Sequence, residues 1–297
     1  MRSLVVLAAA CLACATVRET RGVPGGEELR ATLASPSGDI ALHRWTPSAD
    51  AIAKTGGPRV VVIPELGFDH RLVSPLCARL ARLGFDVVTF DPPRGLKSFD
   101  AFVLTAARVV ATRHEPVRLL AIGVGGEAAF EIARAGGVSG IVAVNVPLRY
   151  EVGDVAFARA LADDLFSPRG WTADDARARL LLGGGRSTPW RELARLERAT
   201  VALSPALAAD VADRFARHAS IVLPHVPIRL FASVKDNVVP PEDVLEPPDP
   251  SWHPAYARRL GKMELFARDY GHLDWLASDR ALDDVVPALA DALEALP

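Results

Sequence analysis

The residues with the clearest chemical potential are Asp236 and His272, which stand in two loops late in the chain. Each loop follows a run that is typical of a buried strand, and in an open α/β sheet such loops gather at one edge, where functional groups collect. A carboxylate bonded to one imidazole nitrogen fixes the tautomer and stabilises the protonated ring, which suits a general base. Either residue alone is better explained as a turn former or a satisfied core side chain. The two together predict a site.

Two more loops follow earlier strands and belong to the same edge if all these strands lie in one parallel sheet. The loop Pro64–Phe68 carries the carboxylate of Glu65, followed by Leu66. The loop Gly123–Gly126 is a glycine turn that contains Val124. We therefore expect a carboxylate and a glycine turn to lie near the aspartate and the histidine.

Apolar patterns predict the sheet that would position these loops. Runs of β-branched residues, typical of strands buried on both faces, alternate with helical periodicities, which indicates a doubly wound, mostly parallel α/β sheet. A turn at Pro36–Asp39 predicts an antiparallel hairpin at its edge. The predicted strands are Leu29–Leu33, Ile40–Trp45, Arg59–Ile63, Asp86–Phe90, Val117–Ile122, Ile141–Val146, Pro227–Ser233 and Met263–Arg268, and the predicted helices are Leu72–Leu83, Phe99–Arg113, Gly126–Ala135 and Ala281–Leu296.

The alternation stops between about residues 147 and 223, where signals for helix starts dominate. Thr172 and Asp175 have the spacing of a capping box, and Thr188-Pro189 and Ser204-Pro205 place proline at the first helical position. This segment is therefore predicted to be a helical cap, inserted into a single domain that spans residues 29–297.

The amino terminus is predicted to be a targeting segment. The apolar run Leu4–Ala13 is too short to span a bilayer but has the length of a signal-peptide core. Small residues before Cys14 are typical of a bacterial lipoprotein cleavage site, with Cys14 as the lipidated residue, Cys11 as the alternative, and an ordinary cleaved signal as the rival interpretation. We expect a signal over residues 1–14, a flexible tether over residues 15–28, and a membrane-anchored lipoprotein of the bacterial cell envelope.

Charge and cysteine content argue against several partners. Lys plus Arg number 34 and Asp plus Glu number 36, a net charge of -2, so nothing predicts binding to nucleic acid. If Cys14 is lipidated and Cys11 is removed with the signal, Cys77 is the remaining thiol, and one cysteine forms neither an internal disulfide nor a thiolate metal cluster. No cofactor and no metal are expected.

The order of these features resembles the α/β-hydrolase superfamily from Leu29 to the carboxyl terminus. The matching features are a strand and loop, the segment LARLGFDVVTFDPPRG, a glycine turn, a cap, Asp236 in SVKDNVVPPE and His272 in YGHLDWL. In that family the chain order is nucleophile, acid, histidine. The resemblance implies that Asp236 is the acid that orients the imidazole and that His272 is the general base.

Two departures from the family pattern affect its reaction. Aligning the G-x-S-x-G elbow with Ala121–Gly125 places Gly123 at the serine position, followed by Val124. Glycine has no nucleophile, and loss of the serine costs a triad enzyme about a millionfold in turnover. Where the family commonly has His-Gly before the oxyanion site, this chain has Pro64-Glu65 followed by Leu66, and a carboxylate there would oppose developing negative charge. Serine-type ester hydrolysis is therefore not expected.

Other interpretations of these motifs are weaker. Ser74, Cys77 and Ser233 are nominal replacement nucleophiles, but they lie outside the elbow and are explained as packing or turn residues. Gly123–Ala128 satisfies the dinucleotide-binding pattern G-x-G-x-x-A, yet the next strand ends in Val144-Asn145-Val146, without the carboxylate that would bind a ribose.

The sequence leaves two main hypotheses about function. The first is a non-hydrolytic α/β-hydrolase-fold protein that binds a small apolar or lipid-like ligand beneath the cap. The alternative is an enzyme that uses Asp236 and His272 as a general-base dyad in lyase- or oxygenase-like chemistry, with Glu65 either an extra acid or base at the pocket mouth or a solvated loop carboxylate. A serine-hydrolase-type esterase or lipase with an unrecognised nucleophile ranks below both.

Overall fold

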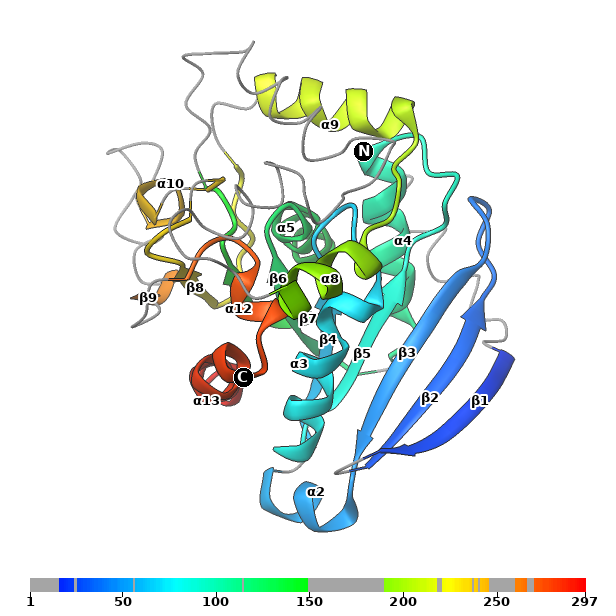
Figure 1. Ribbon diagram of the computed structural model, residues 1–297, viewed down its shortest axis with the longest axis vertical. Coiled ribbons are helices and arrows are strands. Elements are labelled where there is room, and N and C mark those ends of the chain that lie inside the picture. Colours follow the sequence, from blue (N-terminus) through cyan, green and yellow to red (C-terminus); the bar gives the residue numbers. More distant parts are fainter. Residues whose placement is uncertain are drawn as a thin grey trace.

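The computed structural model describes residues 16–23, 26–55, 57–113, 115–148, 190–217, 221–236, 238–239, 241–245, 260–265 and 270–297. Its centre is a nine-stranded sheet in the order β1-β2-β3-β5-β4-β6-β7-β8-β9 (Figure 1). The pairs β1–β2, β2–β3 and β3–β5 are antiparallel. All the other pairs are parallel, which confirms the predicted doubly wound, mostly parallel sheet. The strands are β1 (Thr16–Val23), β2 (Gly26–Leu33), β3 (Ile40–Pro47), β4 (Arg59–Ile63), β5 (Asp86–Asp91), β6 (Val117–Ile122), β7 (Val138–Val144), β8 (Ile228–Ala232) and β9 (Leu260–Leu265).

Helices cover both faces of the sheet. The two central faces of β4 show this division, because Val61 and Ile63 join the core beneath α4 and α5, whereas Val60 and Val62 join the core beneath α3 and α13. Burial on both faces explains the continuous apolar runs of the central strands. The helices are α2 (Ala49–Thr55), α3 (His70–Arg82), α4 (Phe99–Ala111), α5 (Gly125–Ala135), α8 (Trp190–Ala199), α9 (Pro205–Arg217), α10 (Pro241–Leu245), α12 (Asp274–Ala277) and α13 (Asp279–Glu294).

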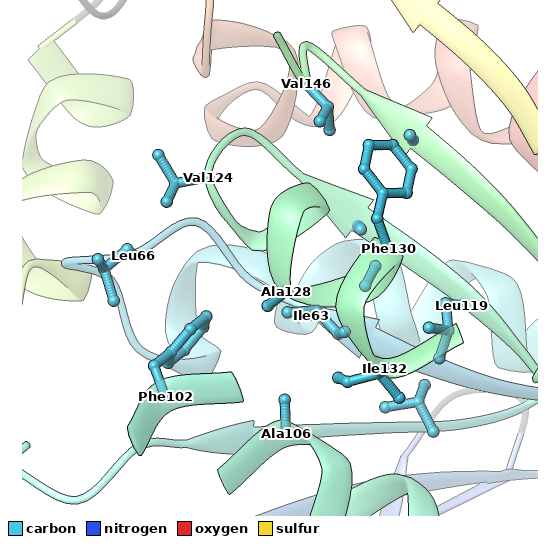
Figure 2. Close-up of a cluster of buried hydrophobic side chains, with 14 of the residues drawn as sticks. Ile63, Leu66, Phe102, Ala106, Leu119, Val124, Ala128, Phe130, Ile132 and Val146 are labelled. Carbon is cyan, nitrogen blue, oxygen red and sulfur yellow. The ribbon is translucent and has the colours of Figure 1, made fainter. Parts of the chain in front are cut away.

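The core under α5 also holds two loops of the candidate site. Leu66 follows β4 and is 2 % exposed, and Val124 follows β6 and is 8 % exposed. Figure 2 shows both side chains at the same end of a cluster that includes Phe102 and Ala128. Burial of these apolar side chains therefore anchors the two loops to each other and to the core.

The described residues of the predicted tether, 16–23 and 26–28, lie in strands and do not form a flexible linker. β1 pairs with β2 from Thr16 opposite Thr32 to Val23 opposite Gly26, and β2 pairs along its length with β3. Strand ladders are made by backbone groups, so a polar strand at a sheet edge forms without the alternating apolar pattern that identifies a half-buried strand. The polar composition of this segment therefore did not predict β1, which extends the predicted hairpin by one strand.

The predicted cap is described only in part. α8 and α9 lie within it, and Ser204 caps α9 by accepting a hydrogen bond from the backbone N–H of Leu207 at 3.1 Å, as the sequence predicts. The predicted helix starts at Thr172 and at Thr188-Pro189 lie outside the described residues. Arg214 of α9 forms ion pairs with Asp100 of α4 and Glu127 of α5, and these join the cap to the main domain.

Both cysteines of the predicted signal segment, Cys11 and Cys14, lie outside the described residues. Within the described part of the chain, no helix combines the length and the hydropathy that a membrane span requires. The last predicted strand, Met263–Arg268, begins three residues earlier in the structure, where β9 covers Leu260–Leu265, and residues 266–268 lie outside the described residues.

Candidate active site

The turn between β6 and α5 has the sharp geometry of a nucleophile elbow. Gly123 has φ 51°, its N–H donates to Val144 at 3.0 Å, and its carbonyl accepts from Gly126 at 2.9 Å. A Cβ on Gly125 would lie 2.5 Å from the carbonyl oxygen of Pro64, so the helix can start this close to the preceding loop only with glycine there. The turn therefore has the sharp backbone of an elbow, and Gly123 stands in it at the position that the resemblance aligns with the serine.

The side chain of Glu65 fills the space that a residue at position 123 would use. An ideal Cβ built on Gly123 would lie 1.4 Å from Oε2 of Glu65, well inside any contact distance. The sequence suggested that Glu65 is either a solvated loop carboxylate or a group at the mouth of a pocket. Both suggestions are wrong, because Glu65 is 5 % exposed. The missing side chain at Gly123 and the added carboxylate at Glu65 are therefore complementary.

Glu65 also accepts hydrogen bonds from two backbone N–H groups in the loops after β4 and β6. The N–H of Leu66 donates to Oε1 at 3.0 Å, and the N–H of Val124 lies 3.3 Å from both carboxylate oxygens. In an α/β hydrolase, the amide after the nucleophile and an amide from the loop after the first central strand stabilise the developing oxyanion. The amides of Leu66 and Val124, which the resemblance aligns with that pair, donate to the side chain of Glu65 here. A carboxylate at this turn also stands where a dinucleotide phosphate would approach, which argues against the dinucleotide interpretation.

Asp236 and His272 meet as the resemblance implied. Nδ1 of His272 lies 2.7 Å from Oδ2 of Asp236, and both residues are buried. Oδ1 of Asp236 accepts from the backbone N–H groups of Val238 and Val239, at 2.8 Å each, so the carboxylate is held on both sides. On the other edge of the ring, Nε2 of His272 lies 3.2 Å from Oε2 of Glu65. The site is thus a buried row of carboxylate, imidazole and carboxylate.

The charges on either side of His272 determine its protonation. Burial lowers the pKa of the imidazole, but the charge and hydrogen bond of Asp236, together with those of Glu65, outweigh burial and raise the pKa to about 10. At neutral pH the ring is therefore an imidazolium that donates from both nitrogens. An imidazolium cannot accept a proton, so His272 in this charge state is not a general base.

Asn145 is a site residue that the sequence analysis did not identify. It is fully buried at the end of β7, with φ 53°, a left-handed conformation that asparagine tolerates better than most residues. Its Nδ2 donates to Oγ of Ser233 and to the carbonyl of His272, each at 2.9 Å, and its Oδ1 accepts from the N–H of Ser233 at 2.8 Å. One side chain therefore ties the acid loop to the histidine loop.

The three nominal replacement nucleophiles have structural roles. Ser233 is bonded to Asn145, as described, and Ser74 donates to the carbonyl of His70 at 2.7 Å within α3. Cys77 is 0 % exposed, and desolvation by burial raises the pKa of its thiol strongly, which disfavours the reactive thiolate. None of these side chains is placed at the elbow, in agreement with the packing and turn roles that the sequence favoured.

Comparison with known proteins identifies the fold. No protein-family model and no curated protein sequence matches the chain. Among solved structures, an esterase from Exiguobacterium antarcticum has a TM-score of 0.66 at 13 % identity, covering 89 % of this chain and 99 % of its own. A malate-bound thermophilic esterase from Thermogutta terrifontis has a TM-score of 0.62 at 16 % identity, covering 90 % and 99 %. A monoacylglycerol lipase from Paleococcus ferrophilus has a TM-score of 0.60 at 19 % identity, covering 86 % and 98 %.

Each of these structures covers at least 86 % of this chain. The protein therefore has the α/β-hydrolase fold, as its sequence resemblance predicted. At such low identities the likeness extends to the fold alone, because unrelated reactions share this architecture. What the protein does must be argued from its own site residues.

Proposed function

We propose that this protein is a non-hydrolytic α/β-hydrolase-fold protein that binds a small apolar or lipid-like ligand beside the buried site. The observation that carries the proposal is the placement of Glu65. Its carboxylate fills the place that a Cβ on residue 123 would take, and it accepts hydrogen bonds from the backbone N–H groups of Leu66 and Val124. An ester carbonyl would find neither a hydroxyl nucleophile nor a free oxyanion site. Serine-type acyl transfer needs both of them.

The apolar character of the proposed ligand follows from the way the polar groups satisfy one another. Both ring nitrogens of His272 face carboxylates, and the carboxylate of Glu65 faces two amides and the imidazole. A polar ligand gains little from groups whose hydrogen bonds are already made, and breaking such bonds in a buried place is costly. Contact with apolar side chains is therefore the main interaction that would favour ligand binding here.

The proposal is tested with an uncharged apolar fluorophore, N-phenyl-1-naphthylamine, and a panel of p-nitrophenyl esters. We expect saturable binding of the fluorophore, nearly unchanged affinity in His272→Ala, and no ester turnover above that of buffer. His225→Ala is the matched control, because His225 is an exposed histidine. Ester turnover by the wild type together with a covalent adduct from a serine-directed phosphonate would contradict the proposal, as would the absence of any saturable fluorophore binding.

A second candidate function is acid–base catalysis without a covalent intermediate. The observation that favours it is the intact pairing of Asp236 with His272 at 2.7 Å, since a buried charged group with a shifted pKa is a frequent mark of catalytic sites. In the resting charge state His272 would serve as the acid. A substrate whose turnover falls at least about a hundredfold in His272→Ala would establish this reading over simple binding.

We further propose that the domain is exported and held at a bacterial membrane by a lipid on Cys14, which follows small and apolar residues typical of a lipoprotein signal. Cys14→Ala should move the protein from the membrane fraction to the soluble fraction. Cys11→Ala, which changes the neighbouring cysteine, should leave it in the membrane. The reverse result would assign the lipid to Cys11. If neither variant changes the fraction in which the protein is found, the proposed lipid anchor is contradicted.

A further inference from the structure

A second cluster of titratable side chains lies at the junction of β3, β5 and α3. His43 stands on β3, Asp91 is the last residue of β5, and His70 is the first residue of α3. Nε2 of His43 lies 3.1 Å from Oδ2 of Asp91, and Nδ1 of His70 lies 2.9 Å from the same oxygen. Neither histidine takes part in the site around Glu65 described above.

We propose that His43, His70 and Asp91 form a binding site for a divalent transition-metal ion of the zinc class. One ligand atom from each residue lies within 4.8 Å of the others. A tetrahedral zinc ion with bonds of about 2.0–2.1 Å holds its ligand atoms about 3.3 Å apart, close to the two separations from Asp91. Two imidazoles and one carboxylate are a donor set that suits zinc and its transition-metal neighbours and does not suit magnesium or calcium.

The imidazole rings must rearrange to receive the ion. They are stacked, with centroids 3.5 Å apart and an angle of 11° between their planes. An ion in the plane of one ring would lie outside the plane of the other, so the rings must splay apart around Asp91. Metal binding would replace the ring stack and the hydrogen bonds that Nε2 of His43 and Nδ1 of His70 make to Asp91 with bonds to the ion. Nδ1 of His43 is buried and has no hydrogen-bond partner within the described part of the chain, so the ring can turn without breaking a bond at that nitrogen.

The carboxylate is already oriented, and solvent can reach it. The backbone N–H of His70 donates to Oδ1 of Asp91 at 2.7 Å, leaving Oδ2 toward the rings. The side chains of Asp91 and His70 are 26 % and 17 % exposed, which leaves room for water to complete the coordination. Arg71, whose charge acts on Asp91, donates its side-chain hydrogen bonds to Asp69 instead.

A bound ion would join three elements that the chain brings together from distant positions. β3 carries the amino-terminal hairpin, β5 belongs to the central sheet, and α3 begins soon after the loop of Glu65. The ion would thus fix the hairpin and the start of α3 to the sheet. This inference does not depend on the proposed function, since neither the elbow nor His272 contributes a ligand.

The test is calorimetric titration of Zn²⁺ alone into the full chain, prepared without a histidine tag. We expect one ion per chain, with affinity at least about tenfold weaker in His70→Gln and Asp91→Asn. His70→Gln keeps a hydrogen-bond donor beside Asp91, so it protects the fold while changing the ligand. His225→Gln is the matched control and should bind as tightly as the wild type.

A second measurement separates loss of the site from loss of the fold. Near-ultraviolet circular dichroism should be the same for His70→Gln and wild type without metal, and Zn²⁺ should raise the melting temperature of the wild type but not that of His70→Gln. Absence of saturable binding in the wild type would overturn the site. Equal binding by the wild type and His70→Gln would also overturn it, because the ion would then reside elsewhere.

Discussion

Oε2 of Glu65 lies 3.2 Å from Nε2 of His272, on the side of the ring opposite Asp236. In a triad hydrolase this is the edge at which the histidine contacts the nucleophilic hydroxyl. Here a carboxylate lies at that edge. Asp236 and Glu65 together raise the pKa of His272 to about 10, so the imidazole is protonated at neutral pH.

The influence of Glu65 on His272 can be measured directly. Replacing Glu65 by Gln removes one carboxylate next to the ring, so the pKa of His272, about 10 in the wild type, should fall. NMR titration of the imidazole resonances reports the change. Glu197→Gln, at an exposed helical position, is the control and should leave the pKa as it is. An unchanged pKa in Glu65→Gln would mean that the two groups do not interact.

The same charges predict how stability depends on pH. The pKa of His272 is about 10 in the folded protein, above the ordinary value of 6.5, so the native state binds more protons than the unfolded state between these values. The stabilisation is fully present below about pH 6.5 and is lost as pH rises toward 10. Urea unfolding should show that the free energy of unfolding falls less between pH 6 and pH 9.5 in His272→Gln than in the wild type. Equal losses would contradict this linkage.

Asn145 should be important for stability because it satisfies groups from two loops. Asn145→Ala leaves the buried N–H of Ser233 without its acceptor and places alanine at a φ of 53°, so a loss of about 3 kcal/mol is expected. Asn145→Gly lacks the same hydrogen bonds but accepts the left-handed backbone, and it should lose less. Urea unfolding gives both values. An Asn145→Ala variant as stable as the wild type would show that these bonds are dispensable.

The sequence predicted most of the sheet because its central strands are buried on both faces and therefore carry continuous apolar runs. The resemblance to the α/β-hydrolase superfamily predicted that Asp236 and His272 form a pair. In the structure they meet because their loops follow the adjacent parallel strands β8 and β9. The edge strand β1 was not predicted, because it is held by backbone hydrogen bonds to β2 and its polar side chains carry no pattern typical of a strand.

The role of Glu65 was partly visible in the sequence. The absence of a side chain at Gly123 and the acidic residue in the oxyanion loop were two separate departures from the family pattern, and only the structure shows that one fills the space left by the other. Asn145 gave no motif, because its value lies in bonds to residues that are distant in the chain. The cluster of His43, His70 and Asp91 likewise depends on strand register.

Cys77 should be inert in the native protein. Its thiol is completely buried, and burial raises its pKa, so iodoacetamide should modify it only after unfolding in urea. Peptide mapping by mass spectrometry locates the modification and separates it from the amino-terminal cysteines. Rapid alkylation of Cys77 under native conditions would show that the helix α3 opens readily.

The most direct test of the central claim restores the serine and removes the carboxylate. Gly123→Ser alone should remain inactive on p-nitrophenyl butyrate, because Glu65 occupies the space of the new side chain and both oxyanion-site amides. Combining it with Glu65→Gly frees both, and turnover should rise at least about a hundredfold above the single variant. Adding His272→Ala to the pair should abolish the gain. If Gly123→Ser alone hydrolyses the ester as fast as the double variant, Glu65 does not block the site and the account is contradicted.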